Sequence, residues 1–583
     1  MTNDYITRTV FKKYLSISIA SMAAATAGMM IDGVVIGNFL GSQAMAALGI
    51  VSPLFIIFSA VAGIFSNGSI SLCGQYIGRD QGEKINVVFT VALLCSGAVA
   101  VICALLCIVF SNQLSSLLGA DGDTLFLSAE YVRGLGIGAI PIVVSQVLMA
   151  FTKTDGSPKL GLLSILVMTA VNIALDLVNA LVLHMGMFGM AMATSLSYMA
   201  AMGVCCIHFF KSCNTLRLVK PTQPTKELSA ICWSGMPNAI NKICITLRTA
   251  MLNNLLAIMA GSVAITAFSI QNSLNTMLGA VCTGVGSTTL LISGIFYGEE
   301  DRCTLRDSVR VSLKIGVALT AAVSIAGILF LRPLVMMFGR ENPAATNMAV
   351  HVVFWFLLSL PLYTVNLVFM NYYQSTGNLF MANFMCIGDN FLFMMLFAAG
   401  LSRFMGTEGV WIAFLAGEIA MLAALAAITA WKIKRIPRCL DDFLLLPEQF
   451  GVPEDMQLEI SLENNWAQVS YLSENIGRFC RKHGIDDRRT HHLSLCIEEM
   501  AGNAVNYAFQ DNKKHFLDIR ILIKDHQLIF RMRDDGIPFN PLKKLKEDPD
   551  NPYANIGIRL VEKLSVRTDY RNTVGLNNLI IKL

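Results

Sequence analysis

Long apolar runs dominate the first 440 or so residues, and their lengths predict helices that cross a membrane. A bilayer core needs about 20 apolar residues per helix. Runs of that length cover positions 14–39, 45–73, 86–110, 126–152, 160–184 and 187–210. Six more cover positions 229–259, 263–293, 308–331, 346–372, 380–403 and 408–431. The pattern predicts an all-α polytopic membrane protein with twelve transmembrane helices.

The two groups of six runs resemble each other at an offset of about 220 residues. The segment GSQAMAALGI at 41–50 corresponds to GSVAITAFSI at 261–270, and Pro141 corresponds to Pro361. Chance similarity of apolar segments rarely keeps one register across several helices. Because each half has an even number of spans, we expect two parallel six-helix repeats with a substrate cavity between them. This arrangement favours a transporter over a channel, which more often assembles from several chains.

The pattern changes after position 456, where short strands and amphipathic helices replace the long apolar runs. Residues 515–524 alternate apolar and polar positions, as a half-buried strand does, and 526–533 is its expected partner. A strand is predicted at 457–461, helices at 465–482, 487–509 and 556–564, and two strands at the end of the chain. The tail is therefore expected to form a small cytoplasmic α/β sandwich.

These patterns divide the chain into four expected parts. They are an N-terminal six-helix lobe (1–210), a C-terminal six-helix lobe (211–435), a linker (436–455) and the α/β domain (456–583).

Charge follows the same division. Lys, Arg, Asp and Glu together number 84, and 38 of them lie in 451–583. Lys and Arg gather in one set of loops between the predicted spans, for example at 153–159, 211–226 and 302–310. The positive-inside rule places these loops in the cytoplasm, so both termini of this multi-pass cell-membrane protein are expected there. The net charge of +4 gives no reason to expect a nucleic-acid partner.

Acidic residues inside the predicted spans of the first half include two that we single out as candidates. Asp32 lies in the first span, and Asp176 lies in the fifth span one helical turn after Asn172. Thr194 lies in the sixth span. Charged groups at bilayer depth are costly and are therefore candidates for function. These oxygens could bind Na⁺ or hold a shared proton that substrate displaces; the alternative is that they form hydrogen bonds between helices.

Several segments resemble the multidrug and toxic compound extrusion (MATE) family. They are Asp32-Gly-Val-Val-Ile-Gly37 and the Ala-Ala-Leu-Gly run after it, Pro141 in the fourth span, and the loop Asp155-Gly156-Ser157-Pro158. The resemblance implies an antiporter coupled to Na⁺ or H⁺ that exports amphipathic, often cationic, organic compounds and contacts membrane lipid. It also implies a cation site in the N-terminal lobe made by Asp32, Asn172, Asp176 and Thr194.

The second half offers a weaker candidate. Some family members have a cation site in the C-terminal lobe that uses a Glu in span seven, where this chain has Asn253 and Asn254. Asp389 and Glu418 are further acids within predicted spans and are treated as secondary candidates. The N-terminal site is therefore the favoured one.

The tail contains three polar motifs in order. Glu499, Asn503 and Asn506 share one helix face, Asp534 and Gly536 end a strand, and Asn555-Ile-Gly557 opens a helix. An Asn can place Mg²⁺ beside phosphates, and a Glu can polarise an attacking water or hydroxyl. An Asp at a strand end can accept from an adenine amino group. A helix N-terminus with Gly can hold phosphates.

Together with the closing Gly575-Leu-Asn577, these motifs resemble the GHKL (Bergerat) ATP-binding family, specifically its anti-sigma-factor Ser/Thr kinase branch. The resemblance implies Mg-ATP as cofactor, Glu499 as general base and Asn503 as the Mg²⁺ ligand. It places Asp534 with Gly536 at adenine, and Asn506 and Gly557 at the nucleotide. The usual Gly-x-Gly before the last helix is replaced here by Asn555-Ile-Gly557, which puts the phosphate loop in doubt.

The leading hypothesis is an exporter with an ATP-binding regulatory domain. In the alternative, the membrane part is a sensor and the tail phosphorylates or sequesters a cytoplasmic protein partner. In a third, the tail is degenerate and structural. ATP is not expected to drive transport directly, because the sequence has no GxxxxGK[ST] loop.

Overall fold

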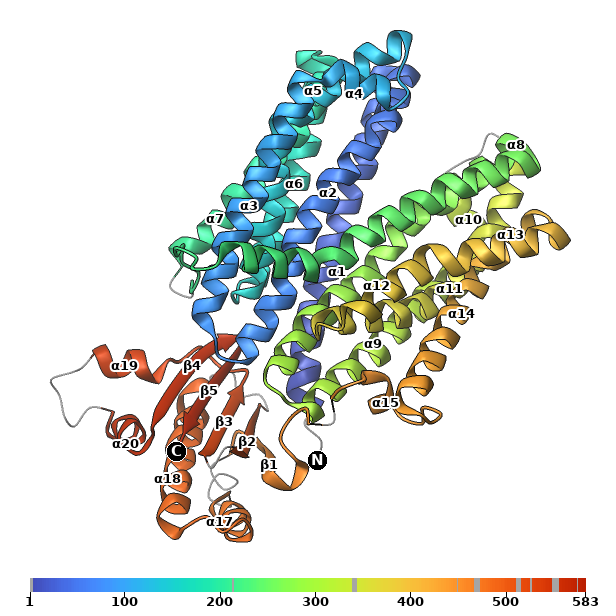
Figure 1. Cartoon of the computed structure of the whole chain (residues 1–583). Helices are drawn as coiled ribbons and strands as arrows, with labels where there is room; N and C mark the ends of the chain where they lie inside the picture. Colours follow the sequence, from blue (N-terminus) through green and yellow to red (C-terminus); the bar gives the residue numbers. More distant parts are fainter. Residues whose placement is uncertain are drawn as a thin grey trace. The chain divides into compact units, whose positions relative to one another are not determined.

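The computed structural model (Figure 1) describes residues 4–211, 214–337, 343–447, 449–465, 472–509, 515–524, 527–547, 555–573 and 575–583. The chain forms two compact units. The unit that we call the membrane unit comprises Tyr14–Glu299 and Ser308–Leu445. The other, the sheet unit, comprises Met1–Lys13, Glu300–Asp307 and Leu446–Leu583.

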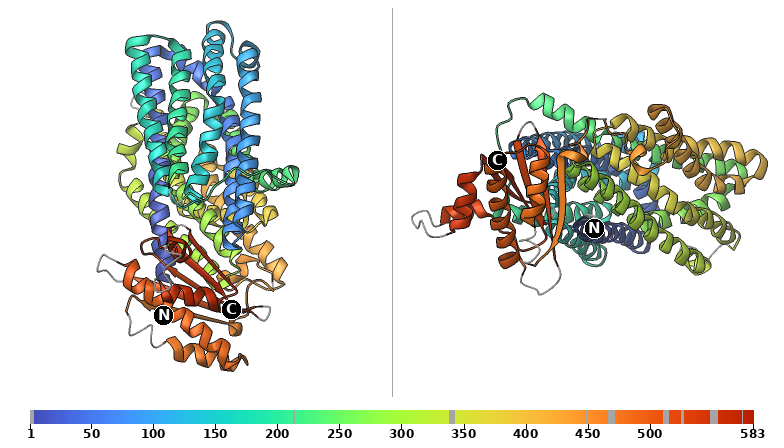
Figure 2. Two further views of the ribbon diagram at one scale, coloured as in Figure 1. Left: turned by 90° about the vertical axis from the view of Figure 1, so that its left-hand side faces the viewer. Right: turned by 90° about the horizontal axis from the view of Figure 1, so that it is seen from below.

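The first half of the chain forms helices that match the first six predicted spans. They are α1 (Asp4–Val35), the π turn η1 (Ile36–Leu40), α2 (Gly41–Gly78), α3 (Gly82–Val109), α4 (Ser111–Leu117), α5 (Gly122–Thr154), α6 (Pro158–Val178), the π turn η2 (Asn179–Leu183), α7 (Gly186–Cys206) and η3 (Ile207–Phe210). Figure 2 shows these helices, coloured blue to green, side by side and nearly parallel.

The second half repeats the plan. Its elements are α8 (Pro224–Gly298), α9 (Arg302–Leu329), α10 (Leu331–Met336), α11 (Pro343–Ser375), α12 (Leu379–Ile387), the π turn η4 (Gly388–Leu392), α13 (Phe393–Met405), α14 (Thr407–Ile433) and α15 (Leu440–Leu444). Ten continuous helical segments among the described residues are long and apolar enough to span a bilayer. Two of them, Arg8–Gly78 and Pro224–Gly298, have 71 and 75 residues, so each contains two predicted spans.

The same backbone break divides both long segments. Gly41 has φ 86° and ψ −178°, and Gly261 has φ 63° and ψ −147°. A residue with a Cβ atom is strained in this region of φ and ψ, so glycine is needed at both backbone breaks. The two backbone breaks are 220 residues apart, which is the offset between the sequence repeats. The repeat is therefore present in the backbone as well as in the sequence.

The two halves meet where α2 packs against α8. A Cβ atom added to Gly78 would lie 2.1 Å from the carbonyl oxygen of Ile295, and one added to Gly298 would lie 2.2 Å from that of Gln75. These two contacts are also related by the 220-residue offset. Small residues allow membrane helices to approach closely enough for dispersion contacts between their backbones. The glycines thus fix a symmetric crossing between the halves.

The sheet unit is built on a five-stranded antiparallel sheet in the order β1-β2-β3-β5-β4. The strands are β1 (Gln457–Glu463), β2 (Phe516–Lys524), β3 (Gln527–Asp534), β4 (Arg567–Thr573) and β5 (Leu576–Lys582). The helices α17 (Leu472–Lys482), α18 (Asp487–Asn503) and α20 (Ile556–Leu564) pack on the sheet, as Figure 1 shows. Ile497, Val561 and Phe530 belong to the shared core. The expected α/β sandwich is confirmed.

Three local expectations need correction or completion. The predicted helix 487–509 is α-helical only to Asn503 and continues as a π turn, η6 (Ala504–Ala508). The segment between the predicted strand 526–533 and the predicted helix 556–564 contains a helix that was not predicted, α19 (Pro541–Glu547). The expected linker 436–455 contains α15, whose Leu444 carbonyl accepts a hydrogen bond from the Tyr372 hydroxyl at 2.9 Å. The start of the predicted helix at 465–482 lies partly outside the described residues.

One ion-pair network lies within the sheet unit. Arg520 on β2 is within 2.9 Å of Asp301 and 3.1 Å of Glu459, and all three side chains are mostly buried. Burial, reinforced by the charge of Asp301, raises the pKa of Glu459 to about 7. The network therefore joins β1, β2 and the segment Glu300–Asp307 within one unit.

Candidate functional sites in the two units

The predicted N-terminal cluster comes together in the membrane unit. Asp32 of α1 and Asp176 of α6 lie within hydrogen-bonding reach of each other. The amide of Asn172 donates to Asp176 Oδ2 at 3.0 Å, which is the expected contact between residues one helical turn apart. The Oδ1 atoms of both acids are buried without a hydrogen-bond partner among the described residues. The cluster is thus rich in acceptors and short of donors.

Thr194 lies beside this cluster, where its side chain is a hydrogen-bond partner of Tyr131. The Thr194 hydroxyl donates to the carbonyl oxygen of Met190 on its own helix at 3.2 Å. Two tyrosines that the sequence analysis did not identify, Tyr131 and Tyr198, lie close enough to feel the charge of Asp32. An aromatic residue in an apolar run carries no signal that separates it from ordinary core packing.

The acids of the second half also lie together. The side-chain amide of Asn366 on α11 donates to Asp389 Oδ1 at 3.0 Å and to Glu418 Oε2 at 2.7 Å. The sequence analysis named both acids but missed Asn366, because a neutral amide within an apolar span is not conspicuous. A cavity lies beside this cluster, with Glu418 on its wall. Asn253 and Asn254 are not among the residues that line it.

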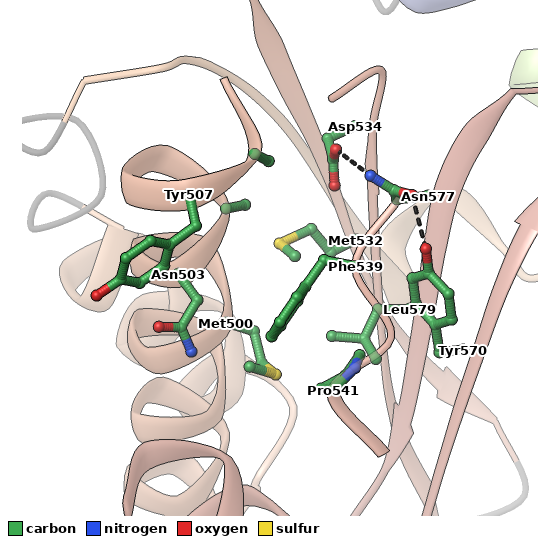
Figure 3. Close-up of a pocket in the computed structure, with 12 residues that line it drawn as sticks. Met500, Asn503, Tyr507, Met532, Asp534, Phe539, Pro541, Tyr570, Asn577 and Leu579 are labelled. Carbon is green, nitrogen blue, oxygen red and sulfur yellow. Dashed lines mark hydrogen bonds between the residues drawn. The ribbon is translucent and has the colours of Figure 1, made fainter. Parts of the chain in front are cut away.

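The sheet unit contains a cavity of about 410 Å³ between α18, η6 and the sheet. Its lining includes Asn503 and Asp534, two of the predicted nucleotide-binding residues. Figure 3 shows the ring of Phe539 between Met500 on the helix and Met532 and Leu579 on the strands. A mostly apolar wall with a few polar groups at its edge is typical of small-molecule sites.

Asp534 is the buried polar group of this cavity. Its Oδ1 accepts from the backbone amide of Gly536 at 3.0 Å and from Asn577 Nδ2 at 2.7 Å. Burial raises the pKa of Asp534 to about 6, against the opposing effect of these two hydrogen bonds. Asn577 is itself held by the Tyr570 hydroxyl, which donates to its Oδ1 at 2.8 Å. The carboxyl group is therefore fixed in place at the end of β3.

Glu499 and Gly557, two further predicted residues, lie together near the start of α20. A Cβ atom on Gly557 would lie 1.9 Å from Glu499 Oε2, so glycine permits the close approach of α20 to α18. Asn555 caps α20 with φ 54° and ψ 40°, a left-handed conformation that Asn tolerates. Asn506 lies in the π turn η6, is exposed, and does not line the cavity. Residues 548–554, which precede Asn555, lie outside the described residues.

The two-lobed membrane unit is typical of a multi-pass transporter, and the α/β sandwich of the sheet unit is typical of an ATPase-like domain. Comparison with known proteins gives the family: the MatE profile matches residues 18–178 and 237–399, more than half of the chain. The chain therefore belongs to the MatE family. A second profile, the histidine kinase-like ATPase domain, matches residues 462–583.

Related proteins agree with this assignment. The chain is 25% identical over 430 residues to "Multidrug export protein MepA" of Staphylococcus aureus (strain MRSA252), covering 72% of this chain and 93% of that protein. It is 23% identical over 423 residues to the MepA protein of Staphylococcus haemolyticus, covering 71% and 92%.

Two solved structures share the fold. An outward-facing multidrug resistance MATE family transporter matches with a TM-score of 0.69 at 21% identity, covering 74% of this chain and 99% of that one. The Vibrio cholerae MATE transporter VcmN matches with a TM-score of 0.69 at 16% identity, covering 76% and 100%. At these identities the likeness establishes the fold of the membrane unit.

Proposed function

We propose that this protein is an antiporter that uses a Na⁺ or H⁺ gradient to export amphipathic, often cationic, organic compounds across the cell membrane. The observation that carries the proposal is the cluster of Asp32 and Asp176, with a buried, unpartnered oxygen on each. The relatives named as multidrug export proteins support the same direction of transport and drug-like substrates.

The coupling follows from the electrostatics of that cluster. Two nearby carboxylates of low solvent exposure repel each other, so both are ionised only when a cation lies between them. Na⁺ would find oxygens of Asp32 and Asp176 within reach, while H⁺ would be shared by the same two carboxyls. Because the amide of Asn172 donates to Asp176, its own oxygen is left available as a further acceptor. A substrate that binds the cation-free state of this pair more tightly would release the bound cation, which is the exchange that an antiporter performs.

Transport of a fluorescent cationic dye into or out of proteoliposomes tests this proposal. We expect dye flux to follow an imposed Na⁺ or H⁺ gradient and to stop following it in the Asp32→Asn variant. Imposing each gradient separately identifies the coupling ion. Flux that ignores both gradients in the wild type, or full gradient-driven flux in Asp32→Asn, would contradict the proposal.

We further propose that the sheet unit binds Mg-ATP and regulates the transporter. The chemistry of the donor set fits the nucleotide: Asp534 offers a buried carboxylate for an adenine amino group, and the cavity beside it is apolar. Asn503 would hold Mg²⁺, and the start of α20 with Gly557 would face the phosphates. Glu499 lies against Gly557 and would act as general base in any phosphoryl transfer to water or to a protein partner. Bound Mg²⁺ would neutralise phosphate charge.

Titration of the full-length protein in detergent with Mg-ATP tests nucleotide binding. We expect Asn503→Ala to weaken binding by at least about tenfold, as the loss of a metal ligand does. No binding in the wild type would leave the sheet unit with a structural role only, and equal binding in wild type and variant would remove Asn503 from the Mg²⁺ site.

The pKa of Asp534 adds a test of its placement at adenine. An adenine amino group needs the ionised carboxylate as acceptor, and burial raises the pKa of Asp534 to about 6. ATP affinity should therefore fall as the pH is lowered through about 6. The Asp534→Asn variant should bind more weakly and lose this component of the pH dependence, which separates it from titration of the phosphates. An unaltered pH profile in that variant would remove Asp534 from the adenine site.

A further inference from the structure

The C-terminal lobe contains a cavity of about 420 Å³ that the proposed coupling site does not use. Its walls come from α8, α11, η4 and α14. Unlike the cavity of the sheet unit, it has charged and amide side chains among its mostly aromatic and aliphatic other lining residues: Arg248, Gln271, Asn275, Asn390 and Glu418. A polar cavity within membrane-spanning helices is costly to maintain, so it is a candidate for ligand binding.

One side of this cavity carries negative charge and unused acceptors. Glu418 lies on the wall, and Asn366 holds its carboxyl group together with that of Asp389. Gln271 is 1% exposed, lines the cavity, and has a buried Oε1 without a hydrogen-bond partner among the described residues. A buried acceptor without a donor loses its hydrogen bond to water and gains nothing in return. A ligand with N–H groups would supply the missing donor.

The other side of the cavity carries one positive charge. Arg248 of α8 lines the cavity and lies close enough to feel the charges of Asp389 and Glu418. In the part of the chain that the structure describes, no ion pair within 4.0 Å engages its guanidinium. A guanidinium has five donors arranged to bind a carboxylate through two parallel hydrogen bonds. Arg248 is thus available for an anionic group on a ligand.

We propose that this cavity binds the head group of a zwitterionic substrate. The carboxylate of the substrate pairs with Arg248, and its protonated amine contacts Glu418 and Gln271. A purely cationic ligand would be repelled by Arg248, and a purely anionic one by Glu418 and Asp389. A ligand that carries both charges satisfies both walls and brings no net charge into the membrane. The proposal deepens the proposed export function by naming a substrate class, and it assigns substrate contact to a lobe separate from Asp32 and Asp176.

A matched pair of dyes tests the inference. One is a zwitterionic rhodamine with aromatic amino groups and a free carboxylate; the other is its methyl ester, which is a permanent cation of nearly the same size. Binding of each to the full-length protein in detergent is measured by fluorescence anisotropy without any ion gradient. We expect the wild type to bind the zwitterion at least about tenfold more tightly than the ester, as one charge-assisted pair allows.

Three variants locate the selectivity. Arg248→Gln should remove the tenfold preference by weakening the zwitterion alone, and Arg248→Lys should restore part of it. Glu418→Gln should weaken both dyes, because both carry the positive group. Arg403→Gln is the matched control, since Arg403 is an exposed arginine near the end of α13 in the same lobe and should change neither affinity.

Wild-type protein that binds the ester as tightly as the zwitterion would overturn the inference without any variant. Equal weakening of both dyes in Arg248→Gln, or no weakening, would also overturn it. The measurement is independent of coupling, because no gradient is present. The two proposals can fail separately. If the wild type prefers the zwitterionic dye but dye flux does not depend on either gradient, the antiporter proposal is contradicted and this inference is not.

Discussion

The two lobes of the membrane unit share a backbone plan but differ in chemistry. Gly41 and Gly261 turn the chain at equivalent points, and Gly186 and Gly406 repeat the pattern with φ 61° and 62°. The polar groups do not follow this symmetry. Among the described residues, the N-terminal cluster contains two acids without a basic partner, whereas the C-terminal cluster has two acids bridged by Asn366 with an arginine nearby.

The difference indicates which lobe couples transport to a cation and which lobe recognises substrate. Helix breaks and close crossings are requirements of the fold, so both halves of the repeat keep them. Buried charges are costly and are retained only where they act. An acid pair without compensation has to take up a cation, while an acid pair next to Arg248 already has a positive charge within reach. The first arrangement suits coupling, and the second suits recognition of a substrate.

The largest expected effect comes from removing one acid of the N-terminal pair. Asp176→Asn leaves a single carboxyl that no longer needs a shared cation, so gradient-driven dye flux should fall by roughly 100-fold, the equivalent of about 3 kcal/mol. Proteoliposome flux under an imposed Na⁺ or H⁺ gradient measures it. The equivalent change in the other lobe, Asp389→Asn, should reduce flux much less. A larger loss in Asp389→Asn would move the coupling site to the C-terminal lobe.

The sequence predicted this division only in part. Run length and the 220-residue repeat were enough for twelve spans, because the bilayer imposes both helix length and backbone closure. Asp32, Asp176, Asp389 and Glu418 were found because an acid within an apolar run is conspicuous. Arg248 was missed although it carries the same signal within the seventh span.

Other features carry no such signal. The π turn Ala504–Ala508, which leaves Asn506 exposed, depends on a one-residue shift of backbone hydrogen bonds. Nothing in the residue types from Ala504 to Ala508 marks that shift. The bridge made by Asn366 depends on contacts between α11, η4 and α14, which single-helix patterns cannot give.

A smaller difference is expected between the amides of the two clusters, Asn366 and Asn172. Asn366 donates to two carboxyl groups and Asn172 donates to one. Replacing each by Leu removes hydrogen bonds to charged acceptors, so Asn366→Leu should destabilise the protein by about 3 kcal/mol and Asn172→Leu by about half as much. Thermal unfolding in detergent compares the two. Equal losses would mean that the two acid pairs are held in the same way.

Equal effects are expected instead at the two helix breaks. Gly41→Ala and Gly261→Ala both place a Cβ in a strained backbone region, which should cost about 1–3 kcal/mol each. No heavy atom lies within 4 Å of the added Cβ at either site, so the loss would reflect backbone strain alone.

Gly49→Ala on the same helix as Gly41 is the control. It also has no neighbouring atom within 4 Å, and its φ is not positive. It should stabilise the protein slightly, by up to about 1 kcal/mol, because alanine favours a helix over glycine. Unequal losses at Gly41 and Gly261 would show that the repeat is less exact in the backbone than the dihedral angles indicate.

The smallest effect is expected at Thr194, and it decides how many oxygens the coupling site needs. The repeat places Phe414 at the corresponding position, so the C-terminal lobe has no hydroxyl there. Because the Thr194 hydroxyl donates to Met190 on its own helix, its loss in Thr194→Ala should change stability by no more than about 0.5 kcal/mol.

The effect of Thr194→Ala on gradient-driven flux should depend on which coupling ion the site binds. If the coupling ion is H⁺, two carboxyls suffice and flux should change by less than about twofold. If it is Na⁺, which needs several oxygen ligands, the concentration of Na⁺ for half-maximal flux should rise clearly. A large loss of flux under an H⁺ gradient alone would contradict both readings, since no oxygen of Thr194 is needed to share a proton between Asp32 and Asp176.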